Sequence, residues 1–182
     1  MKYYKKLEGK RIYLSQMSVE DTDTYVKWMS DFSVTDGLGG SSRIVSTESE
    51  KKWIVENADN YQFAIVRKED NVLLGNCGLQ EINQLHQCAE VGIFIGDEES
   101  RSMGYGSEAL KLLTDYAFDY LNIHNIMLKV FSFNDRAIAC YKKVGFKEIG
   151  RRRKSHYLNG QFYDEVFMDI LREDRVLACQ SK

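Results

Sequence analysis

The sequence predicts a single α/β domain of the α+β type, with a mixed, mostly antiparallel central sheet flanked by helices. Three strand-like segments follow one another between residues 62 and 95 with only short polar turns between them, which is typical of an antiparallel meander. Two strand-to-helix units follow at 93–121 and 126–145. A hairpin pattern with an Asn-Gly turn then covers residues 146–171.

The composition is that of an ordinary globular protein. The chain has 182 residues, of which 43% are hydrophobic and 29% charged, and its net charge is -2. A chain of this length can bury one core without disulfides or a structural metal. The small net charge gives no overall attraction to nucleic acid or to an anionic membrane, so we expect neither partner. We expect one domain over residues 1–182, with its core at about 8–172 and a tail at 173–182.

The cysteines, the histidines and the hydropathy pattern exclude further classes. The four cysteines and three histidines show no spacing typical of a metal site. The N-terminus has no long apolar region, and no run of about 18 apolar residues occurs. We therefore expect a cytoplasmic enzyme with reduced thiols and no metal, and the sequence leaves open whether it forms a homo-oligomer.

The N-terminal third predicts a strand, two helices and a loop between the helices. Residues 10–17 alternate like a strand, and a capping-box pattern at Ser18 begins a helix that runs through Trp28. A second short helix is predicted at 47–57. The segment between them, 30–46, is rich in glycine and serine and lacks periodicity, so it is either a substrate loop or a plain surface connection.

A glycine-bearing turn between a strand and a helix is the strongest functional signal. The apolar segment 93–95 leads into a polar turn that ends in Gly104-Tyr105-Gly106, and an amphipathic helix follows at 107–121. Unpaired amides and the positive end of the helix dipole converge at such a turn, and glycine lets a ligand approach the backbone closely. The turn therefore predicts a site for a phosphate-bearing cofactor.

Other phosphate-binding folds fit this turn poorly. The glycines formally match the dinucleotide fingerprint, but residues 97–103 separate them from the strand that the fingerprint should follow directly. The next strand ends in Phe131-Ser132-Phe133, where a ribose-binding acid is expected. A Walker loop is excluded because no Gly-Lys-Ser/Thr follows the glycines.

A second motif identifies the family that the chain resembles. The two motifs are Arg101-x-x-Gly104-x-Gly106 and Asn134-x-x-Ala137-x-x-x-Tyr141-x-x-x-Gly145-Phe146. Together they resemble the GNAT superfamily of acyl-CoA-dependent N-acyltransferases over nearly the whole chain. The ending at 153–171 is similar to the branch of ribosomal-protein N-terminal acetyltransferases and spermidine acetyltransferases. Ser102-Met103 departs from the Gly-Lys that is usual in this family.

The resemblance implies acetyl-CoA as the co-substrate. The turn would bind the pyrophosphate through backbone amides, the strand before it would pair with the pantetheine arm, and Lys143 could serve the phosphorylated ribose. The residues expected to contact acetyl-CoA are Ile93, Phe94, Ile95, Arg101, Ser102, Met103, Gly104, Tyr105, Gly106, Ser107, Asn134, Ala137, Tyr141 and Lys143.

Acyl transfer to an amine requires two proton movements, one from the ammonium group and one to the departing thiolate. The resemblance gives Tyr141 as the general acid; the alternative is a tyrosine of the core. Glu90, on the strand face opposite Val91 and Ile93, is the candidate base, with a pKa that burial would raise. The alternatives for Glu90 are a solvated glutamate or a substrate-binding anion. Glu81 is a second acid for the substrate.

The acceptor stays open at this point. The run from Glu81 to Glu90 is similar to one in spermidine acetyltransferases, and paired acids suit a polycationic amine. The 30–46 segment has only Asp31 and Asp36, fewer acids than a polyamine site would need. We expect a small-molecule or peptide primary amine, such as spermidine or a protein N-terminus. The alternative class is a non-catalytic acyl-CoA-binding or interaction module.

Overall fold

The computed structural model describes residues 2–175, which form two compact units. The first unit contains the residues up to Gly78 together with Ile93–Leu112, and the second contains Leu79–Gly92 together with the residues from Leu113 onward. Three elements run through both units: β4 (Leu73–Asn83), β5 (Cys88–Ile95) and α4 (Tyr105–Tyr120).

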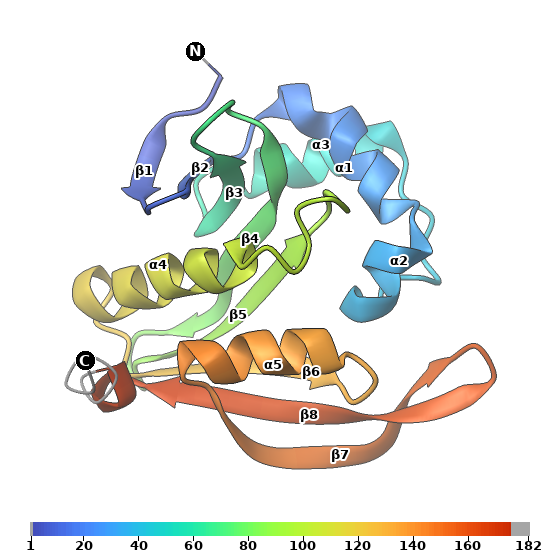
Figure 1. The fold of residues 1–182 in the computed structure, drawn as a ribbon, viewed down its shortest axis with the longest axis vertical. Helices are drawn as coiled ribbons and strands as arrows, with labels where there is room; N and C mark the ends of the chain where they lie inside the picture. The colour runs from blue at the N-terminus through green and yellow to red at the C-terminus, as the bar shows by residue number, and fades with distance from the viewer. Residues whose placement is uncertain (1, 176–182) are drawn as a thin grey trace. The chain divides into compact units, whose positions relative to one another are not determined.

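The first unit is a sheet with the strand order β1-β2-β3-β4-β5, accompanied by short helices (Figure 1). Its own strands are β1 (Lys5–Glu8), β2 (Ile12–Gln16) and β3 (Gln62–Arg67), and β1 to β4 pair antiparallel. Its helices are η1 (Val19–Asp21), α1 (Thr22–Met29), α2 (Phe32–Thr35), η2 (Asp36–Leu38) and α3 (Thr47–Glu56). The Ser46 and Ser49 side chains form a capping box that begins α3.

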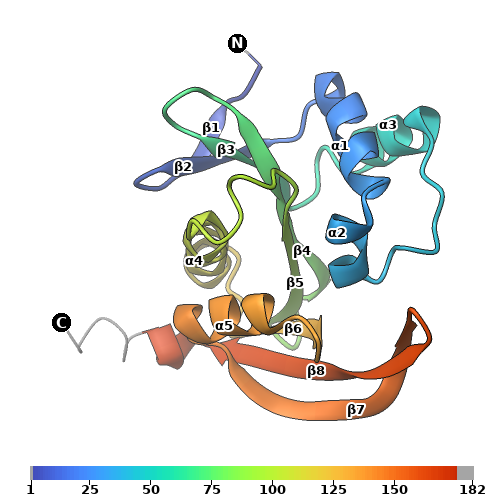
Figure 2. The ribbon, with the colours of Figure 1, turned by 45° about the vertical axis from the view of Figure 1, so that its right-hand side comes forward.

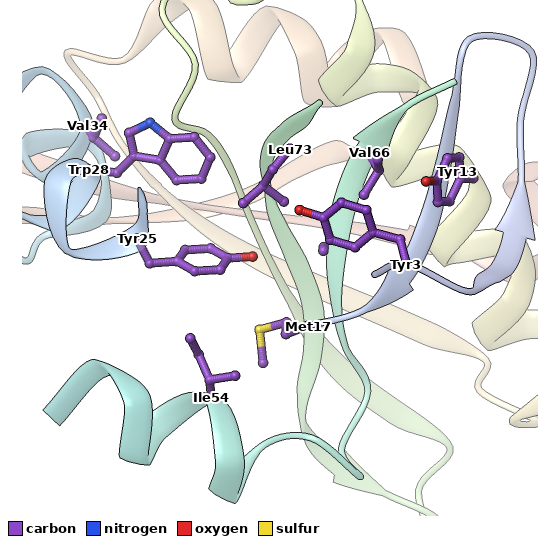
Figure 3. Packing of buried hydrophobic residues seen from close by; sticks show 10 residues of the cluster. Tyr3, Tyr13, Met17, Tyr25, Trp28, Val34, Ile54, Val66 and Leu73 are labelled. Carbon is purple, nitrogen blue, oxygen red and sulfur yellow. The ribbon is translucent and has the colours of Figure 1, made fainter. Parts of the chain in front are cut away.

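Aromatic side chains dominate the core of the first unit (Figure 3). The cluster consists of Tyr3, Tyr13, Met17, Tyr25, Trp28, Val34, Ile54, Ala64, Val66 and Leu73, with Phe94 packed against it. Tyr3 lies upstream of the core limit expected near residue 8, and its hydroxyl donates to both carboxylate oxygens of Asp21 at 2.9 Å. The core therefore begins at Tyr3, earlier than the sequence predicted. The buried carboxylate of Asp21 requires hydrogen-bond donors, and Tyr3 supplies one of them.

The segment 30–46 is more ordered than its composition predicts. It contains α2 and η2, and the side chain of Asp31 caps α2 by accepting a hydrogen bond from the Ser33 amide at 2.8 Å. Helices this short give no periodic signal, because they contain about one turn.

The second unit contains the strand order β4-β5-β6-β8-β7. Its remaining elements are β6 (Asn125–Phe131), α5 (Asp135–Val144), β7 (Lys147–Leu158) and β8 (Gln161–Leu171). β5 and β6 are parallel, whereas β6 and β8 and then β8 and β7 are antiparallel. α5 lies along β6 and β8, and β7 and β8 form a long hairpin (Figures 1 and 2). The predicted fold class, a mixed and mostly antiparallel sheet flanked by helices, is confirmed.

The turn and cap predictions in the second unit are also confirmed. Asn159 and Gly160 have φ values of 48° and 81°, as a type I′ turn requires. The Asn134 side chain caps α5, which ends at Gly145 with a left-handed φ of 118°.

Two boundaries differ from the sequence prediction. α4 begins at Tyr105, so Gly106 belongs to the first turn of the helix and not to the loop before it. Residues 172–175 form a helical turn, and Arg175 forms ion pairs with Asp119 and Asp115. The first part of the expected tail is therefore anchored to α4, and residues 176–182 lie outside the described residues.

Candidate active site

The glycine turn of the first unit presents backbone amides at the start of α4. The first hydrogen bond of the helix runs from the Glu108 amide to the Gly104 carbonyl at 3.2 Å, so the amides of Tyr105 and Gly106 precede it. Gly104 has a φ of 86° and Ser102 a φ of 63°. A left-handed conformation at a serine costs about 1 kcal/mol or more, and such strain is concentrated at functional sites. The turn has the geometry of an anion site.

Arg11, the residue just before β2, stabilises this turn, and no sequence motif points to it. Its Nη1 donates to the Met103 carbonyl at 2.8 Å, and its guanidinium lies 4.6 Å from the centre of the Tyr105 ring. A methyl group at Gly104 would lie 3.2 Å from Nη2 of Arg11, tighter than most contacts of a Cβ atom. The positive φ therefore favours glycine at 104, and an added methyl group would also have to displace the guanidinium by a few tenths of an ångström.

Glu108, in the first turn of α4, fixes Arg11 in place. Its carboxylate accepts hydrogen bonds from the backbone amides of Arg11 at 2.8 Å and Ile12 at 3.4 Å, and from Nε of Arg11 at 3.1 Å. Burial opposes the charge on Glu108, but these hydrogen bonds and the adjacent guanidinium outweigh it and lower the pKa of the carboxyl group. The N-terminal end of α4 is thereby joined to β2.

The side chain of Arg101 holds the end of β5. Its Nε and Nη2 donate to the carbonyls of Ile95 and Gly96, each at 3.1 Å, and its Nη1 donates to Oγ of Ser33 at 3.0 Å. The sequence motif was interpreted through the backbone amide of Arg101. The structure shows a guanidinium that joins the strand to α2, and it engages the Ile95 carbonyl that the sequence analysis assigned to the pantetheine arm.

Two glycines allow the close packing that positions the segment 93–95. A methyl group at Gly75 would lie 2.0 Å from the Phe94 carbonyl oxygen, and one at Gly96 would lie 2.1 Å from Cδ2 of Trp28. The Phe94 ring makes edge contacts with Tyr25 and Trp28 at centroid distances of 6.4 and 5.9 Å. The backbone of this segment is therefore fixed by packing before any ligand binds.

Glu90 lies in the second unit and is already paired. Its Oε1 lies 3.1 Å from Nε2 of Gln80 and 3.2 Å from Nζ of Lys129, and the side chain of Glu90 is 12% exposed. The sequence analysis expected burial to raise the pKa of a Glu90 carboxyl group without a partner. The structure instead places the ammonium group of Lys129 beside that carboxylate. The signal that could have found Lys129 is its position on β6, the parallel neighbour of β5.

Tyr141 lies on the buried side of α5. It is 9% exposed, and its ring meets that of Phe146 edge-on at 6.1 Å. Burial raises the pKa of its hydroxyl group, so the residue is a neutral phenol throughout the physiological range. Tyr141 and Glu90 therefore belong to separate clusters of the second unit, one around Phe146 and one around Lys129.

The remaining predicted residues of the second unit have different environments. Oδ1 of Asn134 accepts from the amide of Ala137 at 3.1 Å, so a contact with the pantetheine arm is left to Nδ2 of Asn134. Lys143 is exposed near the end of α5, where a mobile cation is accessible to a phosphate. Glu81 is exposed and has a φ of 50°, which interrupts the regular alternation of β4.

Comparison with known proteins assigns the family. Residues 11–147 match the model of the acetyltransferase (GNAT) domain. The chain belongs to this family. It is therefore an N-acetyltransferase, as the two motifs in the sequence predicted. Within residues 2–175 no helix is both long and apolar enough to cross a membrane.

Relatives of the chain support the predicted branch. It is 30% identical to the probable N-acetyltransferase YjcK of Bacillus subtilis over 178 residues, covering 92% of this chain and 98% of that one. It is 34% identical to the spermidine N(1)-acetyltransferase of Vibrio cholerae over 121 residues, covering 66% and 68%. The crystal structure of the V. cholerae spermidine N-acetyltransferase with CoA and spermine has the same fold, with a TM-score of 0.83, 24% identity and coverage of 92% and 99%.

Proposed function

We propose that this protein transfers the acetyl group of acetyl-CoA directly to a primary amine, with Tyr141 as the proton donor and Glu90 as the proton acceptor. The observation that carries the proposal is the glycine turn, in which Arg11 and Arg101 hold the backbone carbonyls of Met103, Ile95 and Gly96. With those carbonyls held, backbone amides and the positive end of α4 remain to meet an anion.

The residues of the chain fit the pyrophosphate and the pantetheine arm of acetyl-CoA. A side chain at Gly104 would be strained and would press on Arg11, so the turn stays open to a bulky diphosphate. The amide of Arg101 donates to the carbonyl of Glu98 at 3.1 Å, so we assign the pyrophosphate to the amides of residues 102–106. We assign the pantetheine arm to the backbone of 93–95 and Nδ2 of Asn134, and the ribose phosphate to Lys143. Bound acetyl-CoA supplies an activated acetyl thioester.

Tyr141 is suited to donate a proton because it remains protonated. The departing thiolate is stabilised by gaining a proton. Because burial keeps the phenol protonated and uncharged until the thiolate forms, Tyr141 can supply that proton. Glu90 would accept the proton of the ammonium group, directly or through water, and Gln80 and Lys129 hold its carboxylate in one orientation.

Substitution of Tyr141 tests the proton-donor role. We expect Tyr141→Phe to lower kcat by about 10-fold to 1000-fold with little change in CoA affinity, since the phenyl ring preserves the packing against Phe146. Release of CoA thiol measured with a panel of amines gives kcat, and calorimetry gives the affinity for CoA. A variant with an unaltered rate would remove Tyr141 from the mechanism.

Substitution of Glu90 tests the proton-acceptor role, and the same assays test the enzyme class. Glu90→Gln should change the pH dependence of kcat/KM as well as its value, because the amide cannot accept the proton. A change in KM for the amine alone would make Glu90 a substrate anchor. Tight CoA binding by the wild-type protein without turnover of any amine would instead support a non-catalytic acyl-CoA-binding module.

A further inference from the structure

The charges around Glu90 indicate what kind of amine this protein acetylates, an inference that rests on the function proposed above. Glu90 shares its carboxylate with Lys129, whose side chain is 46% exposed. β5 and β6 run parallel with Glu90 opposite Met127, and Lys129 is two residues further along β6. Residues two apart on a strand share a face, so the pair lies on the face of β6 opposite its buried residues, Ile126, Leu128 and Val130.

The other acids of this sheet face are also engaged. Asp169 lies opposite Met127 and accepts a hydrogen bond from Nδ2 of Asn125 at 2.9 Å. Glu165 lies opposite Phe131, accepts from Oγ of Ser155 at 3.0 Å and lies 3.6 Å from Arg152. Within residues 2–175, the acids that β5 and β8 present on this face thus have a cation or a hydrogen-bond donor beside them.

The two acids of the 30–46 segment accept hydrogen bonds from other residues of the same segment. Asp31 caps α2 through the Ser33 amide, and this hydrogen bond holds the pKa of Asp31 below its usual value. Asp36 accepts a hydrogen bond from the Ser41 hydroxyl. Each carboxylate therefore already has a hydrogen-bond donor within the segment.

We propose that the acceptor is an amino-carboxylate: a primary amine with a carboxylate a few bonds away, as in an α-amino acid. The ammonium group of such a molecule would take the place of Lys129 at Glu90, while its carboxylate would pair with the released Lys129. In the complex, Glu90 is then paired with the ammonium group of the acceptor, and Lys129 with its carboxylate. A polyamine would instead bring a second cation next to Lys129, and like charges at this separation oppose binding.

Matched pairs of amines separate the two classes. The panel consists of alanine against ethylamine, phenylalanine against 2-phenylethylamine, and aspartate against β-alanine, with spermidine as the polycation. In the first two pairs only the carboxylate is removed, and in the third pair one of two carboxylates is removed. We expect the wild-type protein to prefer the carboxylate-bearing member of at least one of the first two pairs by about 10-fold or more in kcat/KM, and to prefer it to spermidine.

Variants of Lys129 test the cause of the preference. Lys129→Arg should keep it, Lys129→Met should reduce it about 10-fold, and Lys129→Glu should reverse it in favour of spermidine. Lys52→Glu makes the same change in net charge on the exposed surface of α3 and should leave the ratio of kcat/KM values unchanged. The proposal is wrong if the wild-type protein prefers spermidine or the carboxylate-free amines, or if Lys129→Glu leaves the ratio unchanged.

Direct binding separates a failure of this proposal from a failure of the proposed function. The same amines are titrated into the CoA complex by calorimetry, so their affinities are compared without turnover. If no amine is acetylated, the proposed function fails, and the ratio of dissociation constants within each pair still decides the amino-carboxylate proposal. Equal dissociation constants within the pairs would overturn it even if every amine is acetylated.

Discussion

The two regions assigned to the substrates are built in different ways. In the first unit the co-substrate region is a backbone surface: the turn before α4 and the end of β5, with the guanidinium groups of Arg11 and Arg101 holding its carbonyls. In the second unit the acceptor region consists of side chains, with Glu90 between Gln80 and Lys129. Under the proposals above, the backbone surface would bind what all acyl-CoA molecules share, whereas the charged pair would select one kind of amine.

This difference predicts where each region tolerates change. The backbone surface depends on glycine and on close packing, so a single added carbon atom should be damaging. The charged pair is half exposed on its lysine side, so substitutions there should alter specificity with little effect on folding.

The largest expected effect on stability is that of Gly96→Ala. The added methyl group would lie 2.1 Å from the Trp28 ring, which is itself held by Tyr25 and Phe94. We expect a loss of about 2–3 kcal/mol in the free energy of unfolding, because an overpacked core must shift its rings. Urea unfolding measures the loss.

Two further variants identify the cause of that loss. Gly92→Ala is the matched control, since a methyl group at Gly92 meets nothing within 4 Å. Trp28→Leu combined with Gly96→Ala should cost less than the sum of the two single changes, because the smaller side chain leaves room for the methyl group. Additive losses would show that the contact with Trp28 is not the reason.

A smaller effect is expected from Arg101→Ala, and it should appear in binding. This change removes the hydrogen bonds to Ile95, Gly96 and Ser33, so the end of β5 is no longer fixed against α2. We expect the affinity for CoA to fall by about 10-fold. Each hydrogen bond to a charged group contributes about 1.5–3 kcal/mol, and only part of the lost free energy would reduce the binding free energy of CoA. Calorimetry with CoA measures the change.

Ser33→Ala tests one of the hydrogen bonds of Arg101 by itself. It removes only the hydrogen bond to α2 and keeps those to Ile95 and Gly96, so CoA affinity should stay close to the wild-type value. If Arg101→Ala binds CoA as tightly as the wild-type protein, the arginine does not contribute to the co-substrate region.

The backbone region was predictable from sequence because its requirements are local. Gly104 marks the turn, and in the second unit Asn134 and Gly145 mark the two ends of α5 in the same way. Each of these residues acts on its own backbone or on that of close neighbours, so residue type and spacing carry the information.

The side chains that support the co-substrate region were not predictable from the sequence. Arg11 reaches the turn from the residue before β2, and Trp28 meets Gly96 from α1. These contacts join segments far apart in the chain, and one charged or aromatic residue among many carries no sign of its partner.

The smallest expected effect is that of Glu108→Gln, and its pH dependence tests how the co-substrate region is held. Hydrogen bonds from Arg11 and Ile12 lower the pKa of Glu108 in the folded protein. A carboxyl group with a lowered pKa contributes stability that is present above its unfolded value and is lost as the pH falls through the folded value. Near pH 7 the variant should therefore be less stable by about 1 kcal/mol, as expected for a partly exposed ion pair with backbone hydrogen bonds.

The difference should begin to shrink as the pH falls below the ordinary pKa of glutamate, about 4.5, and should vanish once the pH has fallen through the lower pKa of folded Glu108, where the protonated side chain resembles glutamine. Urea unfolding over this pH range measures the difference, and Glu56→Gln is the control, since Glu56 forms an exposed pair with Lys52. A difference independent of pH would mean that the shape of the side chain at 108, and not its charge, joins α4 to β2. The backbone surface would then be held by packing and the arginine hydrogen bonds alone.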